Sequence, residues 1–282
     1  MPAKTLVYGS TGFLSKAFIS ELRNRNMDFL SISRSDIDMT NFESVSKFVA
    51  EEEFKSIFFS VGPAPCKTLE MYSQNLNLLI TLLRALESAN KKIKILYVSS
   101  DAVYGSGGAG VRTETSQLSP DTLHGSMHLS RELLLSVTGL ETLILRSCAV
   151  FGLGDPHNSY GPNRFFHDIV GSNRIKLFGN GEDMRDHIWI EDFARIAVDL
   201  HLTTAGTFNV VSGNSMTFLD VAKLMINASG VKSEIELQSS DVRVSEIRYD
   251  NRKLTGALGY SISDSLSRGI KSFFRNKESE TA

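Results

Sequence analysis

The chain has 282 residues, of which 41% are hydrophobic, and its formal net charge is −2. Such a length buries a sizeable core, and the nearly balanced charge excludes a protein held by electrostatics to nucleic acid or to an anionic membrane. An expected strand begins within a few residues of the N-terminus, which leaves no room for a signal peptide, and no apolar run approaches the ~18 residues of a membrane span. Cys66 and Cys148 are expected to be buried thiols, so the sequence predicts a cytoplasmic protein.

The first expected element is the strand Thr5–Tyr8, followed by the glycine-rich segment GSTGFLS (residues 9–15) and a helical pattern to about Arg25. Glycines let the backbone turn tightly, so that a pyrophosphate can sit on the helix N-terminus. A strand, a glycine-rich turn and a helix in this order predict a dinucleotide site, with an ordinary βα turn as the alternative. The residues of this turn that we assign to cofactor binding are Gly9, Thr11, Gly12, Phe13 and Leu14.

The second expected strand is Phe29–Ser33, and its end should read the ribose of the dinucleotide. A carboxylate at that position would favour NAD, whereas this chain has Ser33 followed by Arg34. Because a guanidinium pairs well with a 2′-phosphate, the pattern predicts NADP. NAD remains the alternative, and a solvated surface arginine is the simpler interpretation of Arg34.

Two further strands are expected at Ile57–Val61 and at Ile95–Val98. The second of them runs into the small polar residues Ser99, Ser100 and Asp101. Open α/β sheets keep their chemistry beyond the carboxyl ends of the strands. These three side chains are therefore candidates for an active site.

The helical pattern after Pro120 carries His124, His128 and Glu132 at positions i, i+4 and i+8, so the three share one face. A strand-end hydroxyl that faces a polar stripe on the next helix is an active-site arrangement. The histidine pair also has the spacing of a zinc site on a helix. The i+8 carboxylate lies too far along the axis to close a compact site, so no metal is assigned.

The segments SSDAVYG (residues 99–105) and PDTLHGSMHLSRE (residues 120–132) resemble the extended short-chain dehydrogenase/reductase family. The resemblance is strongest to its nucleotide-sugar epimerases, dehydratases and 4-ketoreductases, which carry S-S/T-x-x-V-Y-G on the strand and Y-G-x-x-K-x-x-x-E on the helix. Ser100 falls on the catalytic Ser/Thr position, whereas His124 and His128 stand at the Tyr and Lys positions. The resemblance covers nearly the whole chain and includes RDHIWIEDFA (residues 185–194).

The resemblance implies a set of catalytic roles. In the family, Tyr is the general acid/base, Lys lowers its pKa and holds the nicotinamide ribose, and Ser/Thr positions the sugar. It therefore implies acid/base roles for Ser100 and His124, a ribose contact for His128 and a proton donor at Asp101. An imidazole has an unperturbed pKa of about 6.5 instead of the ~10 of a phenol, which suits proton transfer near neutral pH.

The resemblance also implies binding residues. Further cofactor contacts are expected at strand ends and at the motif asparagine of the long helix, namely Asp38, Met39, Ser60, Gly62, Asn75 and Ser99. Substrate contacts are expected at Asn163, at Arg185 as a grip on the diphosphate, and at Arg243 as a second phosphate clamp. The long apolar helix from about Leu69 to Ala89 often pairs across a dimer in this family, so a homodimer is expected.

Three interpretations of the altered helix stay open. The first is an NAD(P)-dependent nucleotide-sugar epimerase or 4-ketoreductase. The second is a catalytically silent relative that binds cofactor and nucleotide sugar, or a protein partner, without turnover. The third is the metal site at the histidines. Dehydration is disfavoured, because family dehydratases carry Asp-Glu where this chain has Asp101 and Ala102.

The predicted fold class is α/β, with a Rossmann-like doubly wound parallel sheet and a smaller C-terminal α/β substrate lobe. The dinucleotide-binding domain is expected at residues 1–160 and most of the substrate lobe at 161–275, followed by a polar tail at 276–282. A strand near 207–211 is expected to return from the lobe to the main sheet.

Overall fold

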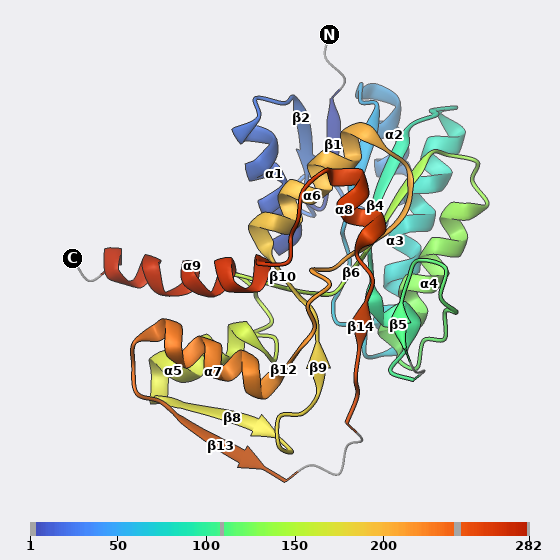
Figure 1. Cartoon of the computed structure of the whole chain (residues 1–282). Coiled ribbons are helices and arrows are strands. Elements are labelled where there is room, and N and C mark those ends of the chain that lie inside the picture. The colour runs from blue at the N-terminus through green and yellow to red at the C-terminus, as the bar shows by residue number, and fades with distance from the viewer. Residues whose placement is uncertain (1–3, 108–109, 240–243, 281–282) are drawn as a thin grey trace. The chain divides into compact units, whose positions relative to one another are not determined.

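The computed structural model describes residues 4–107, 110–239 and 244–280, and the chain divides into two compact units (Figure 1). Unit 1 comprises Met1–Gly107, Ser116–Ser147 and Ala194–Phe208. Unit 2 comprises Gly108–Thr115, Cys148–Phe193 and Asn209–Ala282. The division after Ser147 places the expected domain boundary at residue 160 inside unit 2.

A six-stranded sheet with the order β11-β6-β4-β3-β1-β2 forms the centre of unit 1. The pairings β1–β2, β1–β3, β3–β4 and β4–β6 are parallel. Strand order reverses between β1 and β3, so the carboxyl end of β1 is the switch point at which such sheets bind ligands. The strands are β1 (Thr5–Tyr8), β2 (Phe29–Ile32), β3 (Ser56–Phe59), β4 (Lys94–Ser100), β6 (Thr142–Ser147) and β11 (Gly206–Val210).

Helices pack on both faces of this sheet, because the strands are apolar on both sides. On β3, Phe58 stacks on Phe18 of α1 with ring centroids 4.0 Å apart, whereas the next residue, Phe59, faces Tyr8 and Tyr97 in the opposite core. This arrangement confirms the predicted Rossmann-like doubly wound sheet. The helices are α1 (Phe13–Asn24), α2 (Phe42–Glu51), α3 (Leu69–Ser88), α4 (Leu123–Ser136) and the part of α6 (Ile190–Thr203) from Ala194.

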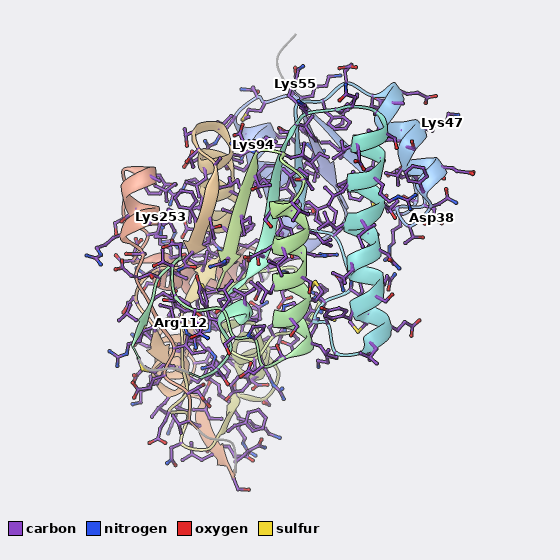
Figure 2. All side chains as sticks on the ribbon, turned by 90° about the vertical axis from the view of Figure 1, so that its right-hand side faces the viewer. Asp38, Lys47, Lys55, Lys94, Arg112 and Lys253 are labelled. Carbon is purple, nitrogen blue, oxygen red and sulfur yellow. The ribbon has the colours of Figure 1, made fainter. Side chains whose placement is uncertain are left out.

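The amino and carboxyl ends of the parallel strands lie at opposite edges of the sheet, and different residues lie at each edge. Figure 2 shows Lys55 and Lys94 at the edge where β3 and β4 begin, and α3 and α4 side by side along the sheet. The Lys94 ammonium donates to the carbonyl oxygen of His201 at 2.7 Å and also to that of Thr204, which ties the start of β4 to the end of α6. The opposite edge, where the parallel strands end, carries the candidate residues of unit 1.

Unit 2 consists of short strand pairs and helices around a separate aromatic core. Its core includes Phe151, Phe165 and Phe218. The strand pairs are β7 (Ala149–Phe151) with β10 (His187–Trp189), β8 (Arg174–Phe178) with β13 (Glu234–Gln238), β9 (Met184–Arg185) with β12 (Met216–Thr217), and β5 (Val111–Arg112) with β14 (Arg248–Tyr249). The helices are α5 (Pro162–Ser172), α7 (Phe218–Ser229), α8 (Arg252–Leu258) and α9 (Ser265–Glu280).

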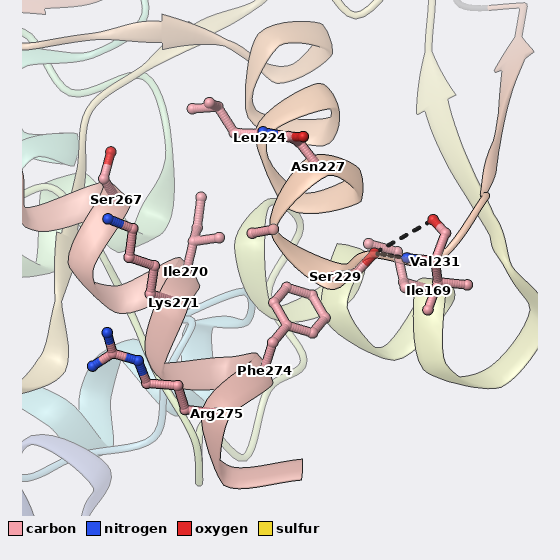
Figure 3. A pocket seen from close by; sticks show the side chains of 11 residues that line it. Ile169, Leu224, Asn227, Ser229, Val231, Ser267, Ile270, Lys271, Phe274 and Arg275 are labelled. Carbon is pink, nitrogen blue, oxygen red and sulfur yellow. Dashed lines mark hydrogen bonds between the residues drawn. The ribbon is translucent and has the colours of Figure 1, made fainter. Parts of the chain in front are cut away.

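A groove of about 540 Å³ lies among α5, α7 and α9 in unit 2 (Figure 3). Its lining combines apolar side chains such as Ile270 and Phe274 with the cations Lys271 and Arg275. The sequence-predicted site residues are not part of this lining. Among the described residues, the helices are all too short or too polar to cross a lipid bilayer.

Candidate active site

The glycine-rich turn after β1 is shaped by one close approach. Gly9 has a φ of +89°, and a Cβ on it would lie 2.8 Å from the Cβ of Val61, which follows β3. The amides of Gly9 and Ser10 both donate to the carbonyl oxygen of Ile32 at the end of β2. Only glycine meets both the dihedral angle and the contact, so the sequence at this position fixes the shape of the switch point.

The N-terminus of α1 has no side-chain cap, in contrast to three other helices of unit 1. Gly12 occupies the cap position without a capping bond, and the first turn carries no acidic residue. In α2, α3 and α4 the cap side chain accepts a main-chain N–H. Uncapped N–H groups at a helix start attract an anion. Thr11, Phe13 and Leu14 belong to this turn, so the turn fits the pyrophosphate of a nicotinamide dinucleotide.

Ser15 lies in the first turn of α1, where the helix packs against the end of β3. Its side chain is buried, and its hydroxyl lies 2.8 Å from the hydroxyl of Ser60 at the end of β3. Two small hydroxyl residues satisfy each other where α1 packs against the strand. The assigned cofactor residue Ser60 therefore also has a structural partner.

The turn after β2 contains a carboxylate that sequence reasoning missed. Asp36 accepts hydrogen bonds from the main-chain N–H and the hydroxyl of Ser33, at 2.7 and 2.8 Å. The side-chain bond and then the main-chain bond from Ser33 lower the pKa of Asp36 below its usual value. The adjacent Arg34 is exposed. The spacing S-x-x-D is typical of a turn stabilised by a side chain, so it would have indicated this contact from the sequence. Both an acceptor and a cation therefore stand in the turn that the sequence predicts to contact the ribose.

Two other assigned cofactor residues, Asp38 and Met39, interact with the protein itself. Asp38 accepts from the main-chain N–H and the hydroxyl of Thr40, at 2.9 and 2.7 Å. The Met39 side chain is fully buried in the core that covers β1 and β3. Their contact with adenine stays a prediction.

Gly62, Asn75 and Arg131 interlock at the end of β3. Gly62 has a φ of +143°, and a Cβ on it would lie 2.0 Å from the Asn75 side-chain oxygen. The Asn75 amide donates to the carbonyl oxygens of Pro63 and Met71 at 2.9 and 2.8 Å. The Arg131 guanidinium donates to the carbonyl oxygens of Asn75 and Val61, at 3.0 and 3.1 Å. A helix of the next βα unit thus anchors this loop.

Ser100 and Asp101 stand at the carboxyl end of β4, where a 3₁₀ turn, η1 (Asp101–Tyr104), begins. The Ser100 hydroxyl accepts from the N–H of Ala102 at 3.2 Å and donates to Asp101 at 3.3 Å. Gly125 lets α4 approach this turn, because a Cβ there would lie 2.2 Å from the Ala102 carbonyl oxygen. The strand end and the start of α4, which carries His124, are therefore held close together.

The two helix histidines contact each other, and each has a further partner. Their rings meet edge to face, with centroids 4.6 Å apart. His124 Nδ1 accepts from the main-chain N–H of Cys66 at 3.3 Å, and His128 Nδ1 lies 2.6 Å from the hydroxyl of Tyr97 on β4. The sequence predicted that the histidines share a face, but it did not reveal Tyr97 as a partner.

Burial and a fixed cation lower the pKa of both imidazoles, which favours their neutral forms. Desolvation, and then the positive charge of Arg131, lower the pKa of His124. The pKa of His128 falls well below its usual value through desolvation, His124 and Arg131. Burial also raises the pKa of Tyr97, so its hydroxyl keeps its proton and is able to donate to His128 Nδ1. In His124 the main-chain N–H of Cys66 makes Nδ1 an acceptor, which places the proton of the neutral ring on Nε2.

Glu132 belongs to a different, structural cluster. It accepts from Ser99 at 2.6 Å and from Arg146 at 2.7 Å, and Arg146 also donates to the Tyr104 hydroxyl at 3.0 Å. This buried ion pair joins α4, β4 and β6. In the parts of the chain that the structure describes, no group of three or more metal-ligating side chains converges. The hydroxyl of Ser99, an assigned cofactor residue, is directed to Glu132.

The predicted substrate residues lie in unit 2. Asn163 is buried and holds its own loop, bonding to Gly152 N and O at 3.0 and 3.2 Å and to Asp155 at 2.7 Å. One Arg185 nitrogen, Nη1, donates to the Met184 carbonyl and the Ser245 hydroxyl, both at 2.7 Å. Arg243 lies outside the described residues. All three substrate contacts stay predictions.

The comparison with known families identifies the class of protein. Residues 5–210 match the family described as the NAD dependent epimerase/dehydratase family. That match covers more than half of the chain, so the chain belongs to this family.

The similar curated proteins are nucleotide-sugar enzymes. The chain is 25% identical over 183 residues to a dTDP-glucose 4,6-dehydratase from Actinoplanes sp., a match that covers 59% of this chain and 54% of the relative. It is 27% identical over 203 residues to a UDP-glucose 4-epimerase from Mycolicibacterium smegmatis, covering 65% of this chain and 63% of the relative. The chain thus spans between about half and two thirds of the length of these relatives.

Solved structures share the fold over the whole chain. The UDP-glucose 4-epimerase of Thermotoga maritima with UDP-glucose has a TM-score of 0.86 at 20% identity, covering 99% of this chain and 100% of that one. The protein RMD from Pseudomonas aeruginosa, complexed with NADPH, has a TM-score of 0.83 at 18% identity, covering 99% and 100%. At these identities the likeness establishes the fold.

Proposed function

We propose that the protein is an NAD(P)-dependent nucleotide-sugar epimerase or 4-ketoreductase that acts by hydride transfer at a sugar carbon. The observation that carries this proposal is the placement of Ser100 and His124. A 3₁₀ turn and Gly125 hold the strand-end hydroxyl and the start of the histidine helix against each other. The family membership and the uncapped start of α1 support a nicotinamide cofactor.

Each of these residues has a proposed role in binding or in the reaction. A nicotinamide dinucleotide supplies hydride chemistry when bound, and the first turn of α1 would hold its pyrophosphate. Ser100 orients the reacting oxygen of the sugar and is itself oriented by Asp101 and the Ala102 amide. His124 takes the acid/base role at that oxygen. Asn163 and Arg185 are proposed to contact the nucleotide sugar, Arg185 through a guanidinium suited to a diphosphate.

The choice between NADP and NAD is also part of this proposal. Arg34 favours the 2′-phosphate of NADP, as the sequence predicted. Asp36, two residues on, is a carboxylate of the type that reads the free ribose of NAD, but its hydrogen bonds to Ser33 occupy one of its oxygens. We favour NADP on this ground.

A homodimer is proposed through the outer faces of α3 and α4. Leu133 on α4 is 60% exposed, and Val137 directly after this helix is 81% exposed. Val137 also lines a hollow of about 480 Å³ between the end of α4 and α3. Apolar side chains that flank a hollow favour a protein contact. Sedimentation velocity would give a dimer, and a monomer at micromolar concentration would contradict the proposal.

The function is tested with purified protein and the variant His124→Phe. Titration with NADPH and NADH by fluorescence measures cofactor binding. A panel of 4-keto and 4-hydroxy nucleotide sugars, followed by nicotinamide absorbance and by NMR of the product, measures turnover. We expect His124→Phe to lower turnover by about 10²–10⁴-fold and to leave cofactor affinity within about twofold.

The exposed residue His157 provides the matched control, because His157→Phe makes the same substitution away from the helix. It should keep full turnover. Unchanged turnover in His124→Phe would refute the acid/base role. Tight binding of cofactor and nucleotide sugar by the unmodified protein without any turnover would instead show the catalytically silent relative.

A further inference from the structure

The inference concerns Arg131, a residue that no family motif assigned. It is 2% exposed and lies on α4, three residues after His128. Its guanidinium stacks over the rings of Phe59 and Tyr97, with centroid distances of 5.2 and 6.0 Å. Within the described part of the chain its recorded polar partners are carbonyl oxygens and the Tyr97 hydroxyl, with no carboxylate among them. Among the described residues, Arg131 is therefore a buried positive charge without a carboxylate partner.

Its neighbours are the two imidazoles. The titratable and charged groups that face them are Arg131 on α4, Tyr97 on β4 and Cys66 ahead of α3. Among the described residues no carboxylate bonds to either ring, since the nearby Glu132 is held by Ser99 and Arg146. A proton added to either ring would place a second positive charge near the buried Arg131, which is unfavourable, most of all at the buried His128.

The hydrogen bonds also select the tautomer. The Cys66 amide can only donate, so Nδ1 of His124 must keep its lone pair to accept from it at 3.3 Å. In a neutral ring the proton then resides on Nε2. We propose that Arg131 and the Cys66 amide hold His124 as an uncharged imidazole that offers the sugar a hydrogen-bond donor at Nε2 and no basic lone pair. This inference rests on the proposed function for its substrate.

This tautomer of His124 favours the reduction of a carbonyl over the oxidation of a hydroxyl. Reduction adds a hydride to a carbonyl carbon, breaks the C=O π bond and leaves an electron pair on oxygen. The Nε2–H stabilises that oxygen and then gives it a proton, and an acid of the buffer, rather than neutral water, supplies the proton that restores Nε2–H. Oxidation of a hydroxyl needs an acceptor for the hydroxyl proton, and Nε2 in this tautomer offers none. An epimerase that passes through a ketone must do both. The site therefore fits the reduction of a keto sugar nucleotide better than epimerisation.

NMR of the protein without cofactor or substrate tests the tautomer directly. The protein contains six histidines, which ¹⁵N-histidine labelling makes visible, and the spectra of His124→Phe and His128→Phe assign the two rings. Long-range ¹H–¹⁵N spectra distinguish the two neutral tautomers and the cation. We expect His124 in the neutral Nε2–H form near neutral pH, and we expect it to take up its second proton at a lower pH than a free imidazole does. A proton on Nδ1, or ordinary titration, would overturn the proposal.

Two variants separate the charge of Arg131 from its packing. Arg131→Met removes the charge and should raise the protonation constant of His124 about tenfold, whereas Arg131→Lys should leave it near that of the unmodified protein. Arg84→Met is the matched control, since Arg84 also lies over a ring, Phe42, at 4.7 Å but away from the histidines. Equal titration in Arg131→Met and Arg131→Lys would contradict the role of the charge.

The outcomes distinguish this inference from the proposed function. An Nε2–H tautomer in a protein that turns over no nucleotide sugar would uphold the inference and reject the function. Turnover by a protein whose His124 carries its proton on Nδ1 would do the reverse. With active protein, the expected result is reduction of 4-keto sugars at least about tenfold faster than epimerisation of 4-hydroxy sugars, and the opposite order would refute the preferred direction.

Discussion

At the scale of single residues, the same side chain often serves the fold and the site. Ser60 bonds to Ser15 where α1 packs, and Asn75 holds the loop that contains Gly62. Asn163 makes three hydrogen bonds within its own loop. A substitution at such a position changes stability and binding together. Variants that test binding alone must therefore come from exposed positions.

Arg34 is such a position. Its replacement by alanine should lower the affinity for NADPH about tenfold and leave the affinity for NADH nearly unchanged, because only the 2′-phosphate pairs with the guanidinium. Fluorescence titration of both cofactors measures the ratio. Lys47→Ala, which removes an exposed cation from α2, is the control and should change neither affinity (Figure 2). An unchanged ratio in Arg34→Ala would argue for NAD.

At the scale of elements, short contacts at glycines set where the helices stand. Gly125 is in α4 with ordinary helical geometry, yet its Cα faces the main chain of η1. The chain thus fixes the distance between the Ser100 turn and His124 by leaving out one methyl group. Gly9 acts in the same way between the ends of β1 and β3.

Gly125→Ala tests this spacing. The added Cβ would lie 2.2 Å from the Ala102 carbonyl oxygen, so the helix or the turn must shift. Overpacking of this kind costs about 1–3 kcal/mol of unfolding free energy, and the displaced His124 should lower turnover as well. Urea unfolding and steady-state kinetics measure the two effects. Gly171→Ala in α5, where nothing lies within 4 Å of the added atom, should be neutral or slightly stabilising. Equal stability of the two variants would refute the argument.

At the scale of the whole molecule, each unit contains a buried histidine that resists protonation. In unit 1, His201 bonds to the hydroxyls of Thr5 and Ser56, at 3.2 and 2.8 Å. In unit 2, neither ring nitrogen of His187 has a hydrogen-bond partner among the described residues. Burial first, and then a nearby cation, lowers the pKa of each ring to about 4.

These histidines predict a loss of stability in acid. Unfolding releases each ring to its ordinary pKa of about 6.5, so the unfolded state takes up protons as the pH falls below that value. The stabilisation is fully present above about pH 6.5 and disappears as the pH falls towards 4. Between about pH 7 and pH 5 the loss is on the order of 1–2 kcal/mol for each ring.

His187→Leu isolates the contribution of unit 2. It replaces the ring with an apolar side chain among Phe151 and Phe218, and it should flatten the pH dependence of the unfolding free energy by about the amount for one ring. The single tryptophan, Trp189, lies in unit 2, so its fluorescence reports the unfolding of that unit in urea. The same slope in the variant as in the unmodified protein would contradict the assignment.

The sequence was a good guide where a pattern is local. The alternation of apolar runs and helical patterns predicted the Rossmann-like sheet, and the i, i+4 spacing placed His124 and His128 on one face. The residues that define their chemistry come from other elements: Cys66 precedes α3, and Tyr97 lies within β4. Such partners depend on packing across the sheet, which no spacing in the sequence encodes. The sequence could have indicated Arg131 as a neighbour of His128, because it follows His128 by three positions on the same helix.

The uncapped start of α1 has a further consequence for the molecule. The helices α2, α3 and α4 each have a cap side chain that accepts an N–H of the first turn, whereas α1 begins after Gly12, which has no side chain to do so. An anion that binds there completes a structural element as well as occupying a site. The free energy of binding this anion therefore also stabilises the first βα unit against unfolding, so a binding measurement and an unfolding measurement should both report it.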